Sequence, residues 1–137
     1  MDSMKKRGRS HCPIAFALEL IGDQWSLLIL RDLLFKGKRL YGEFLNSEEG
    51  IATNILAERL ARLEKTGIIT KTNDPSNKKQ FIYAPTRKGL ELVPLLLEMI
   101  RWSAKHDPKT AAPKEFIRRL EKDSAALLAE VVGQFKK

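Results

Sequence analysis

Apolar side chains recur at three- and four-residue spacing in four stretches of the first half of the chain, a pattern that predicts helices. Pro13 suits the first turn of the first stretch, and Gly22 ends it. Asp23 can cap the second stretch, and Gly67 is a typical C-cap glycine for the fourth. The predicted helices cover about residues 13–21, 24–36, 40–46 and 53–66.

After Gly67 the pattern changes from helical to extended. Residues 68–72 are rich in β-branched side chains, and residues 80–84 form a second extended stretch. The turn cluster DPSN at residues 74–77 lies between them. The sequence therefore predicts a β-hairpin with a polar tip of Asn77, Lys78 and Lys79.

Two further helices complete the pattern. Thr86 can cap a long helix to about residue 106, in which Pro94 indicates a kink or a late start. A last amphipathic helix is expected from about Lys114 to Gln134. A short helix, a turn with Gly50, an amphipathic helix and a hairpin follow one another in the order of a winged helix-turn-helix. The predicted fold class is mainly α with a small β-hairpin wing and extra N- and C-terminal dimerisation helices.

The expected organisation is one DNA-binding domain with extensions at both ends. The predicted parts are a flexible basic arm at 1–10, the winged helix-turn-helix domain at 11–106, a linker at 107–113 and a C-terminal dimerisation helix at 114–137.

Composition excludes several classes of protein. The chain has 137 residues, of which 43% are hydrophobic and 31% charged, a balance typical of one globular domain. One cysteine excludes an internal disulfide, and Cys12, His11 and His106 are too few for a four-ligand zinc site, so we expect no metal and no cofactor. No apolar run approaches a membrane span of about 20 residues or follows the charged N-terminus as in a secretory signal. We therefore expect a cytoplasmic protein without a membrane partner.

The net charge of +8 is concentrated in two regions. Residues 1–11 carry four bases against one acid, and residues 51–90 carry eight against three. The second region contains the predicted helix 53–66 and the hairpin, so the charge favours a polyanion as partner. In a winged helix-turn-helix that helix enters the major groove of double-stranded DNA, and the hairpin reaches the neighbouring backbone or minor groove.

Short sequence matches spread over most of the chain resemble the HxlR-type transcriptional regulators, a MarR-like family. The resemblance covers roughly residues 11–105 as an ordered set of short matches. They are CPI at 12–14, LIGDQWSLLILR at 20–31, GIA at 50–52, Leu56, RL at 59–60, LE at 63–64, GII at 67–69, YAPT at 83–86, Gly89, Leu92 and Trp102.

The resemblance implies a homodimer that binds a pseudo-palindromic operator. Ala52 and Ala57 stand where the family usually carries Ser or Thr, and Pro85 replaces a usual apolar residue. Arg59 has a second interpretation, an ion pair with an acid inside the domain. The implied DNA contacts are Thr53, Asn54, Glu58, Arg59 and Arg62 in the recognition helix, and Arg39, Asn77, Lys78 and Lys79 at phosphates and in the wing.

A dimer also follows from the apolar face of the last helix, which needs a covering surface. The alternative is a monomer in which the last helix folds back on its own chain. The expected interface residues are Ile14, Trp102, Phe116, Leu120, Leu127 and Leu128.

Cys12 is a candidate sensor thiol. It precedes Pro13 near a helix N-terminus, with Arg7, Arg9 and His11 close in sequence, and both features stabilise a thiolate. The resemblance implies that such a cysteine can sense oxidants or electrophiles in some family members. The alternative is a small residue packed at the dimer interface.

Three other functions fit the sequence less well. An enzyme is disfavoured because no third residue is evident to orient a Cys12–His11 pair. RNA binding lacks an evident exposed aromatic platform. A winged-helix protein-interaction module without specific DNA binding is the main alternative, although it needs no cationic wing. The inducer, a small molecule or an oxidant, is not identified by the sequence.

Overall fold

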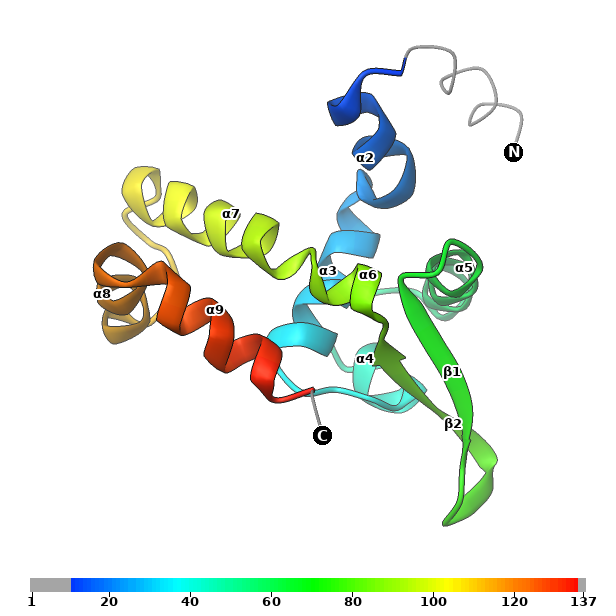
Figure 1. Ribbon diagram of the computed structural model, residues 1–137. Helices are drawn as coiled ribbons and strands as arrows, with labels where there is room; N and C mark the ends of the chain where they lie inside the picture. The colour runs from blue at the N-terminus through cyan, green and yellow to red at the C-terminus, as the bar shows by residue number, and fades with distance from the viewer. Residues whose placement is uncertain (1–10, 136–137) are drawn as a thin grey trace. The chain divides into compact units, whose positions relative to one another are not determined.

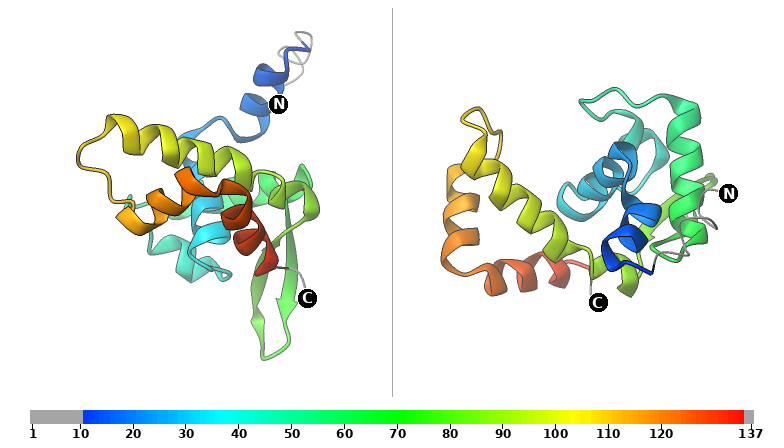
Figure 2. Two further views of the ribbon diagram at one scale, coloured as in Figure 1. Left: turned by 60° about the vertical axis from the view of Figure 1, so that its left-hand side comes forward. Right: turned by 90° about the horizontal axis from the view of Figure 1, so that it is seen from above.

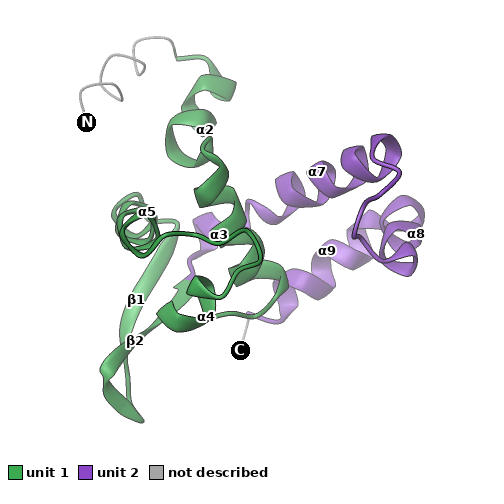
Figure 3. Ribbon diagram, turned by 180° about the vertical axis from the view of Figure 1, so that it is seen from behind, with its two compact units in different colours: residues 1–84 green, residues 85–137 purple. Residues whose placement is uncertain are grey.

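The computed structural model describes residues 11–135, so the predicted basic arm at 1–10 lies outside the described residues. The described chain is mostly helical with one two-stranded sheet, which confirms the predicted fold class (Figure 1). It forms two compact units that divide between Ala84 and Pro85, whereas the sequence predicted a boundary after residue 106 (Figure 3).

Unit 1 contains the predicted helix-turn-helix and wing. Its helices begin and end within about a residue of their predicted positions, and the Asp23 carboxylate caps the second helix by accepting the Ser26 N–H at 3.0 Å. The elements are α2 (Pro13–Ile21), α3 (Gln24–Phe35), α4 (Tyr41–Leu45), α5 (Thr53–Lys65), β1 (Ile69–Asp74) and β2 (Asn77–Pro85).

The core of unit 1 lies between α3 and α5. Leu56, Leu60 and Leu63 form one buried face of α5, at the three- and four-residue spacing that predicted it. They pack with a buried face of α3 that includes Leu30 and Leu33. Because one face of α5 is used in this packing, its opposite face is exposed.

Contacts with α4 fix the base of the wing. Leu40, just before α4, forms an isolated antiparallel bridge with Ile82 of β2, and the Tyr83 N–H donates to the Arg39 carbonyl at 2.8 Å. The rings of Phe44 and Tyr83 meet edge to face, with centroids 6.1 Å apart. The hairpin therefore leaves the helices of unit 1 from a packed origin, and it projects beyond them in both Figure 1 and Figure 2.

The hairpin is longer than predicted and its turn is tighter. β1 extends to Asp74 and β2 begins at Asn77, so only Pro75 and Ser76 form the turn. Asn77 and the two lysines that follow it therefore lie in β2, close to the turn, and not at the tip as predicted. Asp74 accepts hydrogen bonds from the Ser76 N–H at 2.9 Å and the Ser76 hydroxyl at 2.8 Å, which stabilises the short turn.

Unit 2 corrects two predictions of single long helices. Its elements are α6 (Arg87–Leu90), α7 (Val93–His106), α8 (Lys114–Lys122) and α9 (Ser124–Gly133). The predicted cap at Thr86 is confirmed, because its hydroxyl accepts the Gly89 N–H at 3.1 Å. The helix nevertheless stops at Leu90, and Pro94 lies in the first turn of α7, where its missing N–H costs no hydrogen bond.

The predicted last helix is broken at Asp123. This residue has a non-helical backbone conformation (φ −153°, ψ 76°), and its carboxylate caps α9 by accepting the Ala126 N–H at 3.1 Å. The break lets α8 and α9 each pack against α7 and against each other, which buries Leu120 and Leu127 (Figure 2). The C-terminal helices thus cover their own apolar faces within one chain.

Candidate nucleic-acid interface

The N-terminal half of α5 presents polar side chains to solvent. Thr53, Asn54 and Glu58 are all exposed, as the predicted recognition helix requires. Ala52 occupies the N-cap position of α5, and no side chain caps the helix there. The Tyr41 hydroxyl donates to the Thr53 carbonyl at 3.0 Å, which ties the start of α5 to α4.

Arg59 and Arg62 have a different environment from the other predicted contacts. Arg59 Nε donates to Asp23 Oδ2 at 2.7 Å, and an Arg62 terminal nitrogen donates to Asp23 Oδ1 at 3.0 Å. Arg59 also pairs with the neighbouring Glu58. The ion-pair interpretation of Arg59 is therefore confirmed, and Arg62, which was predicted to face the groove, is held in the same way.

These partners lower the pKa of the Asp23 carboxylate. Partial burial opposes its ionisation, but hydrogen bonds from Arg59 and from Ser26 outweigh burial and lower the pKa of Asp23 to about 2. One carboxylate therefore caps α3 and neutralises cationic charge on α5.

The wing carries exposed cations near its turn. Lys78 and Lys79 are exposed on β2, beside the exposed Asn77, whose side chain accepts the Lys79 N–H at 3.1 Å. Lys71 on β1 adds a cation that the sequence pattern did not single out. Its ammonium lies 4.2 Å from the centroid of the exposed Phe81 ring, a cation–π contact that places charge on the wing.

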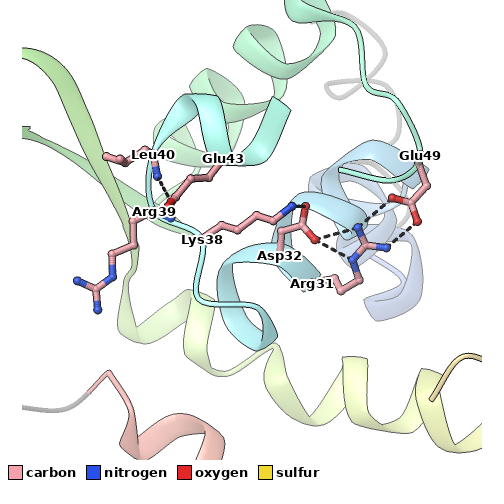
Figure 4. A network of polar contacts seen from close by, with 7 residues as sticks. All are labelled: Arg31, Asp32, Lys38, Arg39, Leu40, Glu43 and Glu49. Carbon is pink, nitrogen blue, oxygen red and sulfur yellow. Dashed lines mark hydrogen bonds and ion pairs between the residues drawn. The ribbon is translucent and has the colours of Figure 1, made fainter. Parts of the chain in front are cut away.

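Arg39 lies at the junction of α4 and the wing. Its backbone N–H donates to Glu43 Oε1 at 2.8 Å, and the Leu40 N–H donates to the same oxygen at 3.0 Å. These two hydrogen bonds lower the pKa of Glu43 and hold the start of α4. The Arg39 side chain is exposed and points away from the neighbouring polar network (Figure 4).

That network holds the loops on both sides of α4 to the end of α3 (Figure 4). Asp32 is buried, and its carboxylate accepts hydrogen bonds from Arg31 at 2.9 Å and from Lys38 at 3.2 Å. Arg31 also donates two hydrogen bonds to Glu49, at 2.7 and 2.9 Å, in the turn that precedes α5. The bidentate pair lowers the pKa of Glu49 to about 2 and raises that of Arg31.

The predicted dimer residues divide into exposed and buried sets. Ile14 on α2 and Trp102 on α7 are 70% and 63% exposed, and Phe116 and Leu128 are half-buried. Leu120 and Leu127 are buried within the single chain, which contradicts their prediction as interface residues and agrees with a last segment that folds back. Cys12 is exposed at the N-cap position of α2.

The described residues hold neither a metal cluster nor a spanning helix. No group of three or more His, Cys, Asp or Glu side chains among them is arranged to hold a metal ion. Within the same residues no single helix is long and apolar enough to cross a membrane, and α2 and α3 reach that length only as a pair bent by 78°.

The sequence alone did not reveal the roles of Asp23, Arg31, Glu49 and Lys71. Asp23 was predicted only as a helix cap, although the cap is one of its three contacts. Its arginine partners lie 36 and 39 residues away, and Arg31 is 18 residues from Glu49. Local spacing carries no signal for such pairs, because they form only when α3 meets α5 and the turn before it.

Helix α5 packs on α3 and exposes its polar face, and a hairpin with exposed lysines follows it. These features together define a winged helix-turn-helix regulator. Residues 20–111 match the family described as HxlR-like helix-turn-helix. The chain belongs to this family, and the relatives it matches are named as transcriptional regulators.

Relatives support this assignment. An uncharacterised HTH-type transcriptional regulator of Synechocystis sp., sll1512, is 39% identical over 88 residues, with 64% of each chain covered. The chain thus spans just under two thirds of that relative.

Solved structures agree in fold. The crystal structure of the protein PA1607 gives a TM-score of 0.70 at 36% identity, covering 79% of this chain and 75% of that one. The reduced transcriptional regulator YodB from Bacillus subtilis gives 0.57 at 31% identity, covering 72% and 97%. The redox regulator HypR in its oxidised form gives 0.60 at 29% identity, covering 69% and 96%.

The Arg31–Glu49 pair predicts a specific dependence of stability on pH. The folded-state pKa of Glu49 is lowered from its ordinary 4.5 to about 2, so its contribution is present above pH 4.5 and is lost as the pH falls towards 2. We expect Glu49→Gln to lower the free energy of unfolding at pH 7. We expect the gap from wild type to close between about pH 5 and pH 2. Urea unfolding at several pH values in this range measures the difference in free energy of unfolding. The control is Glu48→Gln, which removes the charge of the neighbouring exposed acid. A gap that does not change with pH would contradict the assignment.

Proposed function

We propose that this protein is a sequence-specific DNA-binding transcriptional regulator that acts as a homodimer on a pseudo-palindromic operator. The observation that carries the proposal is the exposed polar N-terminal half of α5 in the same unit as a cationic wing. The region of highest positive charge in the sequence, residues 51–90, contains both elements. A protein-interaction module would not need cations at these positions.

The exposed side chains suit base reading and backbone binding. Asn54 can pair with adenine through two hydrogen bonds, and Glu58 can accept a hydrogen bond from the cytosine amino group. The Thr53 hydroxyl can form a hydrogen bond with either of these bases. Arg39, Lys71, Lys78 and Lys79 are exposed cations that suit phosphates, which fix the register without reading sequence. In a two-fold dimer the half-sites lie about 10 bp apart or a multiple of it.

Substitutions in α5 and in the wing should therefore affect binding differently. Asn54→Ala should cost about 1–3 kcal/mol for the operator and relax discrimination, because it removes hydrogen bonds to a base edge. Lys78→Ala with Lys79→Ala should weaken binding to all sequences and reduce the log–log salt slope by about 1 for each phosphate that is no longer neutralised. Fluorescence anisotropy with a duplex from upstream of the coding region, against a scrambled duplex, measures both effects.

Lys114→Ala is the matched control, since it removes an exposed cation from α8 in the other unit. Failure of the wild type to bind either duplex at low salt would reject the proposal and favour the interaction module. Equal affinity for both duplexes would reject specificity for that site.

The dimer is supported by uncovered apolar side chains on two helices. Leu95, Met99 and Trp102 are exposed on α7 at four- and three-residue spacing, which makes a continuous stripe. On α2, Ile14, Phe16 and Leu18 are exposed, and only Ile21 is buried. A nine-residue helix with so little covered surface is marginal in water, so a second copy of the chain is the covering surface we propose.

Trp102→Glu should convert the dimer into a monomer, because it places a charge in the apolar stripe of α7. Size-exclusion chromatography with light scattering at micromolar concentration measures the mass. Lys114→Glu, which reverses the charge of an exposed residue on α8, should leave the dimer intact. A wild type of monomer mass, or a Trp102→Glu protein of dimer mass, would contradict this interface.

We also propose that Cys12 senses oxidants. Its exposed position at the start of α2 supports this, and so do the relatives: HypR is named a redox regulator, and YodB has been solved both reduced and treated with diamide. In a dimer the two Cys12 thiols can form one disulfide. As this S–S bond forms, the two thiols lose two protons and two electrons to the azo group of diamide, which becomes a hydrazine.

Diamide should change operator affinity of the wild type by about tenfold and should not change that of Cys12→Ser. Anisotropy before and after treatment measures the affinity, and recovery with dithiothreitol shows that the change is reversible. The proposal fails if the two proteins respond alike, whether both lose DNA or neither does.

A further inference from the structure

We propose that Asp23 is a specificity-determining residue that keeps Arg59 and Arg62 of α5 away from the DNA backbone. The inference rests on the proposed function, because it concerns how the same helix discriminates between DNA sequences. One carboxylate at the start of α3 holds both guanidinium groups through its two oxygens, at 2.7 and 3.0 Å. In this arrangement neither arginine is available as a simple phosphate contact.

The two arginines lie next to the surface that would meet DNA. Arg59 and Arg62 are three residues apart, on the flank of α5 between its buried leucines and its exposed face. Their side chains are 20% and 23% exposed, so each is partly reachable from solvent. Arg59 already pairs with the exposed Glu58 on the groove-facing side of α5, so Asp23 is what draws its guanidinium back towards α3.

Phosphate competes for these groups by the same chemistry that Asp23 uses. A guanidinium binds carboxylate and phosphate oxygens alike, with paired and charge-assisted hydrogen bonds. Contacts with phosphate are made with any sequence, so two free arginines here would raise affinity for all DNA. Held by Asp23, they leave discrimination to the uncharged and acidic side chains Thr53, Asn54 and Glu58.

Arg62 is incompletely satisfied in its position, which makes release favourable once the carboxylate charge is removed. Its Nε is buried and donates to no acceptor among the described residues. A buried donor without an acceptor is destabilising, and movement of the side chain outward would relieve it. Asp23 is thus the group that keeps Arg62 inward.

Asp23→Asn removes the charge but retains the helix cap. Asn is as good an N-cap residue as Asp, and its amide oxygen can still accept the Ser26 N–H. We expect this variant to bind the scrambled duplex about tenfold more tightly, with a log–log salt slope steeper by about 1 to 2. The affinity ratio between native and scrambled duplexes should fall accordingly.

Two further variants separate this effect from other causes. Adding Arg59→Gln and Arg62→Gln to Asp23→Asn should return the slope and the scrambled affinity towards wild type. Glu64→Gln removes a negative charge from the exposed face of the same helix without releasing an arginine, and it should change the slope less. Asp23→Ser, a second uncharged cap, replaces the Asn variant if thermal unfolding shows that the latter has lost its fold.

The result for Asp23→Asn decides the inference. A folded variant with wild-type slope and scrambled affinity would overturn it, and so would a folded variant that loses binding to both duplexes. The proposed function is judged separately, from the wild type on native and scrambled DNA. A wild type that does not discriminate would reject specificity, while the comparison with Asp23→Asn on scrambled DNA would still show whether the arginines are withheld.

Discussion

The packing of α5 on α3 is the interaction on which the rest of unit 1 depends. Three leucines of α5 cover the buried face of α3, and this contact, together with smaller ones to α4 and β1, decides which side of α5 is presented to solvent. The contact is apolar, so it fixes which face is buried but allows some sliding along the helix. The charged contacts at the two ends of α3 supply the missing restraint. Asp23 acts on α5 at the first end, and Arg31 with Asp32 acts on the loops around α4 at the second.

Most of the fold could be predicted because its signals are local. Asp23 and Thr86 are helix caps in the structure as in the sequence, and the leucine spacing of α5 predicted its buried face. The break at Asp123 was missed because Leu120 and Leu127 continue the helical spacing across it, although Asp followed by Ser is itself a start signal. The leucine spacing favours one continuous helix, whereas Asp123 favours the start of a new one. Packing of both α8 and α9 against α7 favours the new start.

The candidate interface could be predicted less completely than the fold. Exposure follows from periodicity, so Thr53, Asn54 and Glu58 lie where the sequence placed them. The environment of an arginine on the flank of a helix depends on what the neighbouring helix presents, and periodicity holds no information about that. The family resemblance placed Arg62 in the groove, whereas a residue 39 positions earlier holds it in the structure. Burial of Leu120 and Leu127 was missed through the same kind of long-range contact.

The two-residue turn of the wing has a consequence for the rate and cost of any docking event. Pro75 has a fixed φ and few accessible conformations, and the Asp74 carboxylate, which is buried, accepts from Ser76 and from Gln80. The tip therefore loses its conformational entropy during folding and has little left to lose on contact with a partner. Because the tip is preorganised, its association with a partner requires no slow rearrangement of the loop.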